Sequence, residues 1–144
     1  MYIKSISELL SDRPMFSIDA TRTVGEACMI LSTRNIGALP VVENGRLVGI
    51  LSERDVIRRC VIGGRDTSTT LVSEVMTREP VTLGPEDSPA SAMDIMLAGQ
   101  FRHLPVCDAG NKLIGMISMR DIPTENRLLV ERFRDYSGMQ AVYG

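Results

Sequence analysis

The run Gly-Ile-Leu-Ser-Glu-Arg-Asp at residues 49–55 returns in the second half of the chain as Gly-Met-Ile-Ser-Met-Arg-Asp at residues 115–121. A second run, Leu-Pro-Val-Val at 39–42, returns 65 residues later as Leu-Pro-Val-Cys at 104–107. The aspartates that end the longer runs are 66 residues apart, so one residue is inserted in the turn between 107 and 113. An internal repeat that fills nearly the whole chain decides the architecture. The chain is therefore one unit written twice.

The composition is that of a globular protein with an aliphatic core. Of the 144 residues, 44% are hydrophobic, 24% are charged and 4% are aromatic, without Trp. A fold of this size hides roughly 70% of the surface that its unfolded chain exposes, so a substantial core can form. These proportions exclude disordered and fibrous classes. The net charge of −2 argues against a nucleic-acid partner, because such binding relies on neutralising phosphates.

The sequence predicts a cytoplasmic protein that contacts no membrane. No apolar run approaches the ~18 residues that a spanning helix needs, and residues 1–8 lack the charged-then-apolar order of a signal peptide. The three cysteines, Cys28, Cys60 and Cys107, are odd in number and lie in apolar patterns. They are therefore expected to be reduced thiols that pack as small hydrophobes, without a metal or redox role.

Each copy is predicted to begin with a short strand and a helix. Residues 15–18 and 80–83 are strand candidates, in which apolar and polar side chains alternate. Thr23 begins a capping box, Thr-Val-Gly-Glu, which is typical of a helix start. In the second copy Ser88 precedes a proline, another favoured start.

A hairpin and a second helix complete each copy. Asn44-Gly45 lies between two strand-rich runs and is the strongest short turn signal, because both residues accept a positive φ. The corresponding turn at 108–112 holds the extra residue. A helix is expected from Ser52 to about Ile62, where two glycines end it.

These patterns predict an α/β fold of the α+β type, with two pseudo-symmetric β-α-β-β-α repeats packed sheet to sheet and an added C-terminal helix. The expected boundaries are 7–64 for the first copy, 65–71 for the linker, 72–124 for the second copy and 125–144 for the C-terminal helix and tail. The segment 124–136 is amphipathic. It is expected to pack on this chain or on a second copy, although binding to a foreign partner uses the same pattern.

The doubled motif and the paired Leu-Pro-Val strands resemble the tandem CBS (cystathionine beta-synthase) domain pair, also called a Bateman module. The resemblance covers roughly residues 7–123 and includes a linker-plus-strand run at 72–77. Residues 36–39 and 102–106 make the chain similar to the small stand-alone bacterial members. The resemblance implies a non-enzymatic sensor in signal transduction, usually a homodimer. Such pairs hold an adenine nucleotide (AMP, ADP, ATP, NAD(H) or S-adenosylmethionine) between the copies.

Two Ser-x-x-Asp motifs are the candidate nucleotide-binding groups. Ser52 and Asp55 lie three residues apart at the start of a predicted helix, and so do Ser118 and Asp121. In a ligand site the serine and the helix amides would contact a phosphate, and the carboxylate would accept both hydroxyls of a ribose. The same spacing is also that of a plain helix cap without a ligand.

Several arginines are candidates for phosphate contacts. Arg54 and Arg120 directly precede the motif aspartates and can form charge-assisted hydrogen bonds to a phosphate. Arg58 and Arg65 flank the linker. These two could serve a larger ligand such as a dinucleotide, or be solvated surface charges.

The two clefts are predicted to be unequal. The first copy carries Gly37 and Ala38 where the second carries Arg102 and His103. The resemblance implies that such a basic pair contacts ligand phosphates. The alternative is a solvated arginine beside a histidine packed at a sheet edge. Pro123 follows the second motif by two residues, so the second helix is expected to kink or restart there.

The resemblance also places adenine in an apolar slot near the ends of the first strands. The residues expected there are Ile18, Leu39, Leu83 and Leu104. Another hypothesis is a ligand-free structural protein or regulatory subunit that acts through contacts with an unknown protein target. An enzyme is disfavoured, and no catalytic cofactor is expected, because the sequence has one histidine, no recognisable nucleophile and base, and no metal-ligand cluster.

Overall fold

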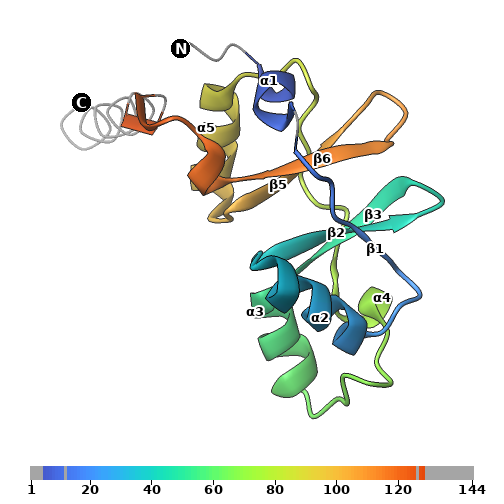
Figure 1. Cartoon of the computed structure of the whole chain (residues 1–144). Helices are drawn as coiled ribbons and strands as arrows, with labels where there is room; N and C mark the ends of the chain where they lie inside the picture. The colour runs from blue at the N-terminus through green and yellow to red at the C-terminus, as the bar shows by residue number, and fades with distance from the viewer. Residues whose placement is uncertain (1–4, 12, 126, 129–144) are drawn as a thin grey trace.

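The computed structural model describes residues 5–11, 13–125 and 127–128, and it contains two sheets with helices packed against them (Figure 1). The first sheet has the strand order β1-β2-β3-β4, with β1 parallel to β2 and the other pairs antiparallel. The second sheet is the antiparallel hairpin of β5 and β6. The strands are β1 (Ile18–Asp19), β2 (Ala38–Glu43), β3 (Arg46–Ser52), β4 (Thr77–Arg78), β5 (His103–Cys107) and β6 (Leu113–Ser118).

The helices differ in length and in hydrogen-bonding pattern. Two of them, α2 and α5, have eleven residues each, and the others have six or fewer. They are α1 (Ile6–Leu10), α2 (Val24–Arg34), α3 (Glu53–Asp55), the π-helix η1 (Val56–Val61), α4 (Val72–Val75), α5 (Pro89–Gly99) and the 3-10 helix η2 (Met119–Asp121). The predicted mixed α/β fold is confirmed. None of the described helices is both long and apolar enough to cross a membrane.

The helix starts follow the sequence signals. The Glu26 N–H donates to Thr23 Oγ1 at 3.2 Å, and the Thr23 N–H donates to the Glu26 carboxylate at 3.3 Å. This is the predicted capping box, which satisfies amides that have no partner inside the helix. Ser88 caps α5 in the same way through the Ser91 N–H, at 3.1 Å. The hairpin turn also has the predicted geometry, with φ of 52° at Asn44 and 78° at Gly45.

The first strands are shorter than predicted. In the first copy only Ile18–Asp19 pair with β2, and in the second copy residues 80–83 contribute a single parallel bridge, between Leu83 and Val106. The run 72–77, expected as linker and strand, forms the helical turn α4 before β4. The reason is local, because the Glu74 carboxylate accepts the Leu71 N–H at 2.7 Å and closes the first turn.

The second helices of the two copies differ. In the first copy α3 continues into η1, so that the helix extends to about Ile62 as predicted, but with wider i→i+5 turns. In the second copy η2 ends at Asp121, and Ile122 is extended with φ −74° and ψ 125°. This is the interruption that Pro123 predicted, and helical structure resumes at residue 124. The predicted C-terminal helix and tail lie mostly outside the described residues.

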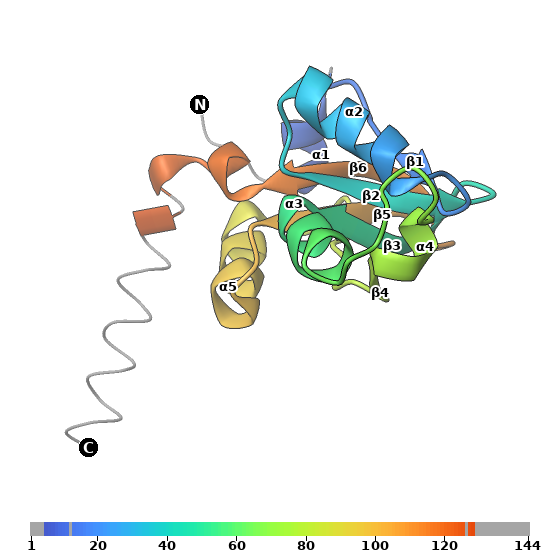
Figure 2. The same cartoon turned by 90° about the horizontal axis from the view of Figure 1, so that it is seen from below.

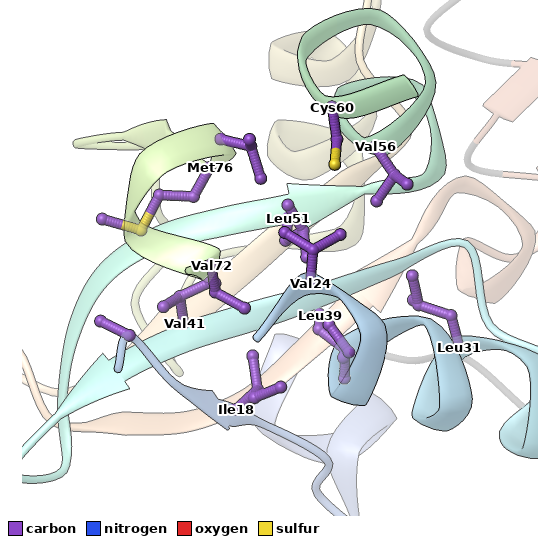
Figure 3. Close-up of a cluster of buried hydrophobic side chains, with 13 residues drawn as sticks. Ile18, Val24, Leu31, Leu39, Val41, Leu51, Val56, Cys60, Val72 and Met76 are labelled. Carbon is purple, nitrogen blue, oxygen red and sulfur yellow. The ribbon is translucent and has the colours of Figure 1, made fainter. Parts of the chain in front are cut away.

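Two short helices are exchanged between the copies. The first core holds β1, α2, the β2–β3 hairpin and α4 from the second half of the chain (Figure 3). The second core holds α5 and the β5–β6 hairpin, and also α1 from the start of the chain. Gly49 and Gly115, the first residues of the two repeated runs, allow the exchanged segments to pack closely against the strands. A β-carbon at Gly49 would lie 2.5 Å from Met76 Sδ, and one at Gly115 would lie 2.8 Å from Leu10.

The sheets of the two copies meet at their hairpins, which overlap when seen from below (Figure 2). The Leu47 N–H donates to the Asn111 carbonyl at 3.2 Å, and the Asn111 side chain donates back to the Leu47 carbonyl at 3.0 Å. Leu47, Cys107 and Leu113 form a small apolar cluster at this junction. Two layers that each expose an apolar face are thereby joined.

The cysteines are free thiols, as the sequence predicted. Cys60 belongs to the first core, and Cys107 lies in the apolar cluster between the hairpins. Burial raises the pKa of the Cys28 and Cys107 thiols, which disfavours the reactive thiolate.

Candidate functional site

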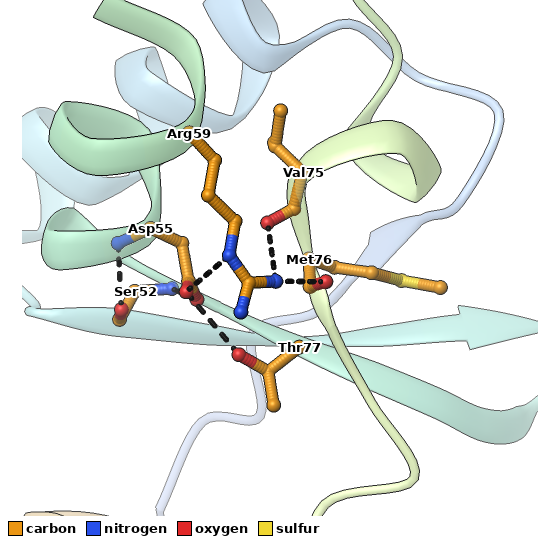
Figure 4. A network of polar contacts seen from close by, with 6 residues as sticks. All are labelled: Ser52, Asp55, Arg59, Val75, Met76 and Thr77. Carbon is orange, nitrogen blue, oxygen red and sulfur yellow. Dashed lines mark hydrogen bonds and ion pairs between the residues drawn. The ribbon is translucent and has the colours of Figure 1, made fainter. Parts of the chain in front are cut away.

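The first Ser-x-x-Asp motif caps the helix that follows it (Figure 4). The Asp55 N–H donates to Ser52 Oγ at 3.1 Å, and the Ser52 N–H donates to Asp55 Oδ2 at 3.0 Å. Asp55 is 8% exposed, so its carboxylate depends on these internal donors. The cap that the spacing allowed is therefore present. A cap of this kind holds the carboxylate in one orientation, which is also what a ligand group requires.

Residues that follow the linker close over the first motif. The Thr77 hydroxyl donates to Asp55 Oδ1 at 3.2 Å. Arg59 lies one helical turn after Asp55, with its Nε 3.9 Å from the same oxygen, and its Nη1 donates to the Met76 carbonyl at 2.9 Å (Figure 4). The carboxylate therefore lies at a junction between the helix of the first copy and the chain that leads into the second copy.

The second motif holds its carboxylate differently. Asp121 Oδ2 accepts the Ser118 N–H at 2.7 Å and the Ser118 hydroxyl at 3.2 Å. Arg13 Nη1 lies 2.9 Å from the same oxygen. Burial opposes ionisation of Asp121, but the hydrogen bonds from Arg13 and Ser118 outweigh it and hold the pKa of the carboxyl below its ordinary value.

Each motif is therefore a composite of both halves of the chain. The segment before β1 supplies Arg13 to the second motif, and β4 supplies Thr77 to the first. The chain just before the first strand of each copy thus lies against the motif of the other copy. A small molecule bound at either motif would contact both copies.

His103 crosses the boundary between the copies. A β-carbon at Gly37 would lie only 3.3 Å from His103 Cε1, so the ring packs against that glycine. Desolvation lowers the pKa of His103, against the opposing effect of the Asp121 and Glu53 carboxylates. The neutral ring is therefore favoured. The adjacent Arg102 is exposed.

The predicted adenine-slot residues are core residues. Ile18 and Leu39 belong to the first core and Leu83 and Leu104 to the second, and none is more than 5% exposed. Ala38 is also fully buried. Both backbone groups of Leu83 already form hydrogen bonds, to the Pro105 carbonyl and from the Cys107 N–H. These residues can form the floor of a slot, but their side chains do not reach the surface.

The predicted arginines remain on the surface. Arg54, Arg58, Arg102 and Arg120 are exposed, and Arg65 forms an ion pair with Glu74 at 3.3 Å. A pair between exposed groups contributes little stability, so it does not hold Arg65 rigidly.

Sequence reasoning missed Arg13 and Arg59, the two arginines that contact the motif aspartates. Arg59 lies four residues after Asp55, and this i,i+4 spacing on a helix is a signal that could have identified it. Arg13 has no such signal, because its partner Asp121 lies in the other copy. Over residues 5–11, 13–125 and 127–128, no group of three or more His, Cys, Asp or Glu side chains is placed to hold a metal ion.

Known proteins share both the sequence pattern and the fold. A profile of the CBS domain matches residues 6–62 and 72–123. The CBS domain-containing protein YhcV of Bacillus subtilis (strain 168) is 39% identical over 106 residues, which cover 74% of each chain. The CBS domain protein PAE2072 from Pyrobaculum aerophilum, solved in complex with AMP, is 28% identical with a TM-score of 0.77 and covers 88% of this chain and 96% of its own. The CBS domain pair of protein MJ0100, in complex with 5′-methylthioadenosine and S-adenosyl-L-methionine, is 26% identical with a TM-score of 0.73 and covers 82% and 95%.

Proposed function

This chain belongs to the CBS domain family, and we propose that it is a non-enzymatic regulatory module that binds an adenine nucleotide at its two Ser-x-x-Asp motifs. The observation that carries the proposal is the composite position of Asp55 and Asp121. Each carboxylate is held by its motif serine and by a residue from the other half of the chain. A ligand that binds there changes contacts between the copies, which is the requirement for a sensor.

The related complexes support an adenosine-containing ligand. PAE2072 was solved with AMP, and MJ0100 with 5′-methylthioadenosine and S-adenosyl-L-methionine. These ligands share adenine and ribose but differ in what the 5′ carbon carries. The shared part is therefore assigned to Asp55 and Asp121, which match the vicinal hydroxyls of a ribose. Ile18, Leu39, Leu83 and Leu104 form the apolar floor beneath adenine.

The variable part of the ligand is assigned to the exposed arginines. Arg54 and Arg120 directly precede the aspartates, and Arg102 is exposed beside the second motif. Their guanidinium groups can pair with phosphate through two parallel hydrogen bonds. His103, whose pKa is lowered by desolvation, adds no charge near neutral pH and acts by shape, against Gly37.

The proposal is tested by thermal unfolding and calorimetric titration with AMP, ATP, NADH and S-adenosylmethionine. A ligand at a hundred times its dissociation constant adds about 2.7 kcal/mol to the free energy of unfolding. Asp55→Asn and Asp121→Asn should each weaken binding. Asp108→Asn is the matched control, because Asp108 also accepts backbone N–H groups but lies in the hairpin turn. Absence of binding by all four nucleotides would rule the proposal out.

A second candidate function is a constitutive scaffold. It is favoured by the internal hydrogen bonds that already satisfy Asp55, and by apolar side chains on η1 and its C-cap, where Ile57 is 55% exposed and Ile62 is 75% exposed. An exposed apolar face of this kind is typical of a protein contact, either with a second copy or with another protein. Light scattering of wild type and Ile62→Asp tests self-association. A scaffold would also retain co-purified protein partners after all nucleotide is removed.

A further inference from the structure

Arg13 and Arg78 follow the exchanged helices α1 and α4, but they form different contacts. Arg13 forms an ion pair with Asp121 of the second motif, at 2.9 Å. Arg78 instead donates to the Ser73 carbonyl at 3.0 Å, and the arginine beside the first motif comes from the motif's own helix. The two nucleotide sites proposed above therefore differ in which part of the chain supplies the cation.

The Asp121 oxygen that Arg13 contacts has no room for a further donor. Oδ2 accepts the Ser118 N–H, the Ser118 hydroxyl and the Arg13 guanidinium, whereas a carboxylate oxygen offers about two lone-pair positions. A ribose hydroxyl can reach Oδ2 only after one donor leaves. The Ser118 N–H is held by the backbone at the end of β6. The Ser118 hydroxyl, at 3.2 Å, can rotate but stays beside the carboxylate, whereas Arg13 has a long side chain that is 39% exposed and can move away from it.

A phosphate at the second motif needs a side-chain cation. The first motif is followed by helical structure from Glu53 to Val61, whereas η2 has three residues and ends at Asp121. So short a helix has almost no dipole with which to stabilise an anion. Once displaced from Asp121, the Arg13 guanidinium remains tethered beside the site and presents the planar donor pair that suits a phosphate.

We propose that Arg13 is a specificity-determining residue of the second nucleotide site. It leaves Asp121 when the ribose hydroxyls bind and then pairs with the phosphate of the ligand. The inference rests on the proposed function and deepens it, because it selects a phosphorylated adenosine over adenosine itself at this site. The first site lacks this device, since Arg59, the arginine near Asp55, donates to the Met76 carbonyl at 2.9 Å.

The test compares the affinities of AMP and adenosine by calorimetric titration in the Asp55→Asn background, in which binding reports mainly the second site. Arg13→Ala should weaken AMP binding by about tenfold, the usual effect of losing one hydrogen bond to a charged group. The same change should tighten adenosine binding, because no ion pair has to break. Arg13→Lys keeps the charge and should retain part of the preference for AMP, and Arg78→Ala is the matched control that should leave both affinities unchanged.

The opposite changes in affinity that Arg13→Ala should cause for AMP and for adenosine distinguish this role from a structural one. A variant that only loosens the fold would weaken AMP and adenosine alike, and that result, or an unchanged ratio, would overturn the assignment of Arg13. Thermal unfolding of each variant confirms that it is folded. Failure of the wild-type protein to bind AMP and adenosine at all would overturn the proposed function as well, so the two failures are distinguishable.

Discussion

The ring of His103 packs against Gly37 across the boundary between the two copies, so closely that a β-carbon on the glycine would lie 3.3 Å from Cε1. Both residues lie just before or at the start of the strand that carries the Leu-Pro-Val run in their copy. The imidazole of His103, from the second copy, thus occupies the space beside Gly37, where the first copy has no side chain. The difference between the two copies at this point, a histidine in one and a glycine in the other, therefore creates a contact between them.

Gly37→Val should therefore lower the free energy of unfolding by about 1–3 kcal/mol, the usual cost of overpacking a close contact. Urea denaturation measures the change. Gly84→Val is the control, because a β-carbon at Gly84 would lie 3.7 Å from its nearest neighbour, an ordinary contact. Equal losses of stability from the two substitutions would show that the contact with His103 does not limit the size of the side chain tolerated at residue 37.

Stability should fall as the pH drops below about 6.5, the ordinary pKa of histidine. Burial lowers the pKa of His103 in the folded protein, so the unfolded chain binds this proton more tightly. The stability that the neutral His103 contributes is fully present above the pKa of this residue in the unfolded chain. It is lost as the pH falls from that value to the lower pKa of His103 in the folded protein. The groups that act on the ring are Asp121, Glu53, Arg102 and Arg120.

Chemical denaturation at pH 7.5 and at pH 5.5 checks this expectation. His103→Gln should show a smaller difference between the two pH values than wild type, because His103 is the only histidine in the chain. If wild type and the variant lose the same stability, His103 is not the responsible group.

The exchange of α1 into the second core predicts a non-additive pair of substitutions. Gly115→Ala alone should destabilise the protein by about 1–3 kcal/mol, because its β-carbon would lie 2.8 Å from Leu10. Leu10→Ala alone removes packing. The double variant should be more stable than the sum of the single effects predicts, because the second change relieves the clash of the first. Additive free energies from urea denaturation would contradict contact between these two residues.

Arg59→Ala should destabilise the protein by about 1–2 kcal/mol, since it removes a charged donor from the Met76 and Val75 carbonyls. The neighbouring Arg58 is exposed, and Arg58→Ala should change stability by no more than about 0.5 kcal/mol. Thermal unfolding compares the two variants. A larger effect at Arg58 would mean that the surface charge of η1 matters more than the contact with the segment after the linker.

Local signals in the sequence predicted much of the fold. Thr23 and Ser88 begin helices because their hydroxyls satisfy amides a few residues away, and Asn44-Gly45 turns a hairpin because both residues accept a positive φ. Pro123 ends the helical turn after the second motif because it disfavours helical geometry at Ile122. The ligand-binding role of the motif residues stays a prediction, because the observed cap is compatible with it and does not require it.

By itself, the sequence determined the repeat, the CBS domain family, the order of most elements and the helix start at each Ser-x-x-Asp motif, because each depends on residues that are near one another in the chain or match across the repeat. Only the tertiary structure decided that α1 packs in the second core and α4 in the first, that Arg13 contacts Asp121, and that His103 packs against Gly37. These contacts join residues that are distant in the chain, and no local period or spacing encodes which of them meet. Arg13 shows the reason, since its partner Asp121 lies in the other copy and nothing near Arg13 in the chain indicates that contact.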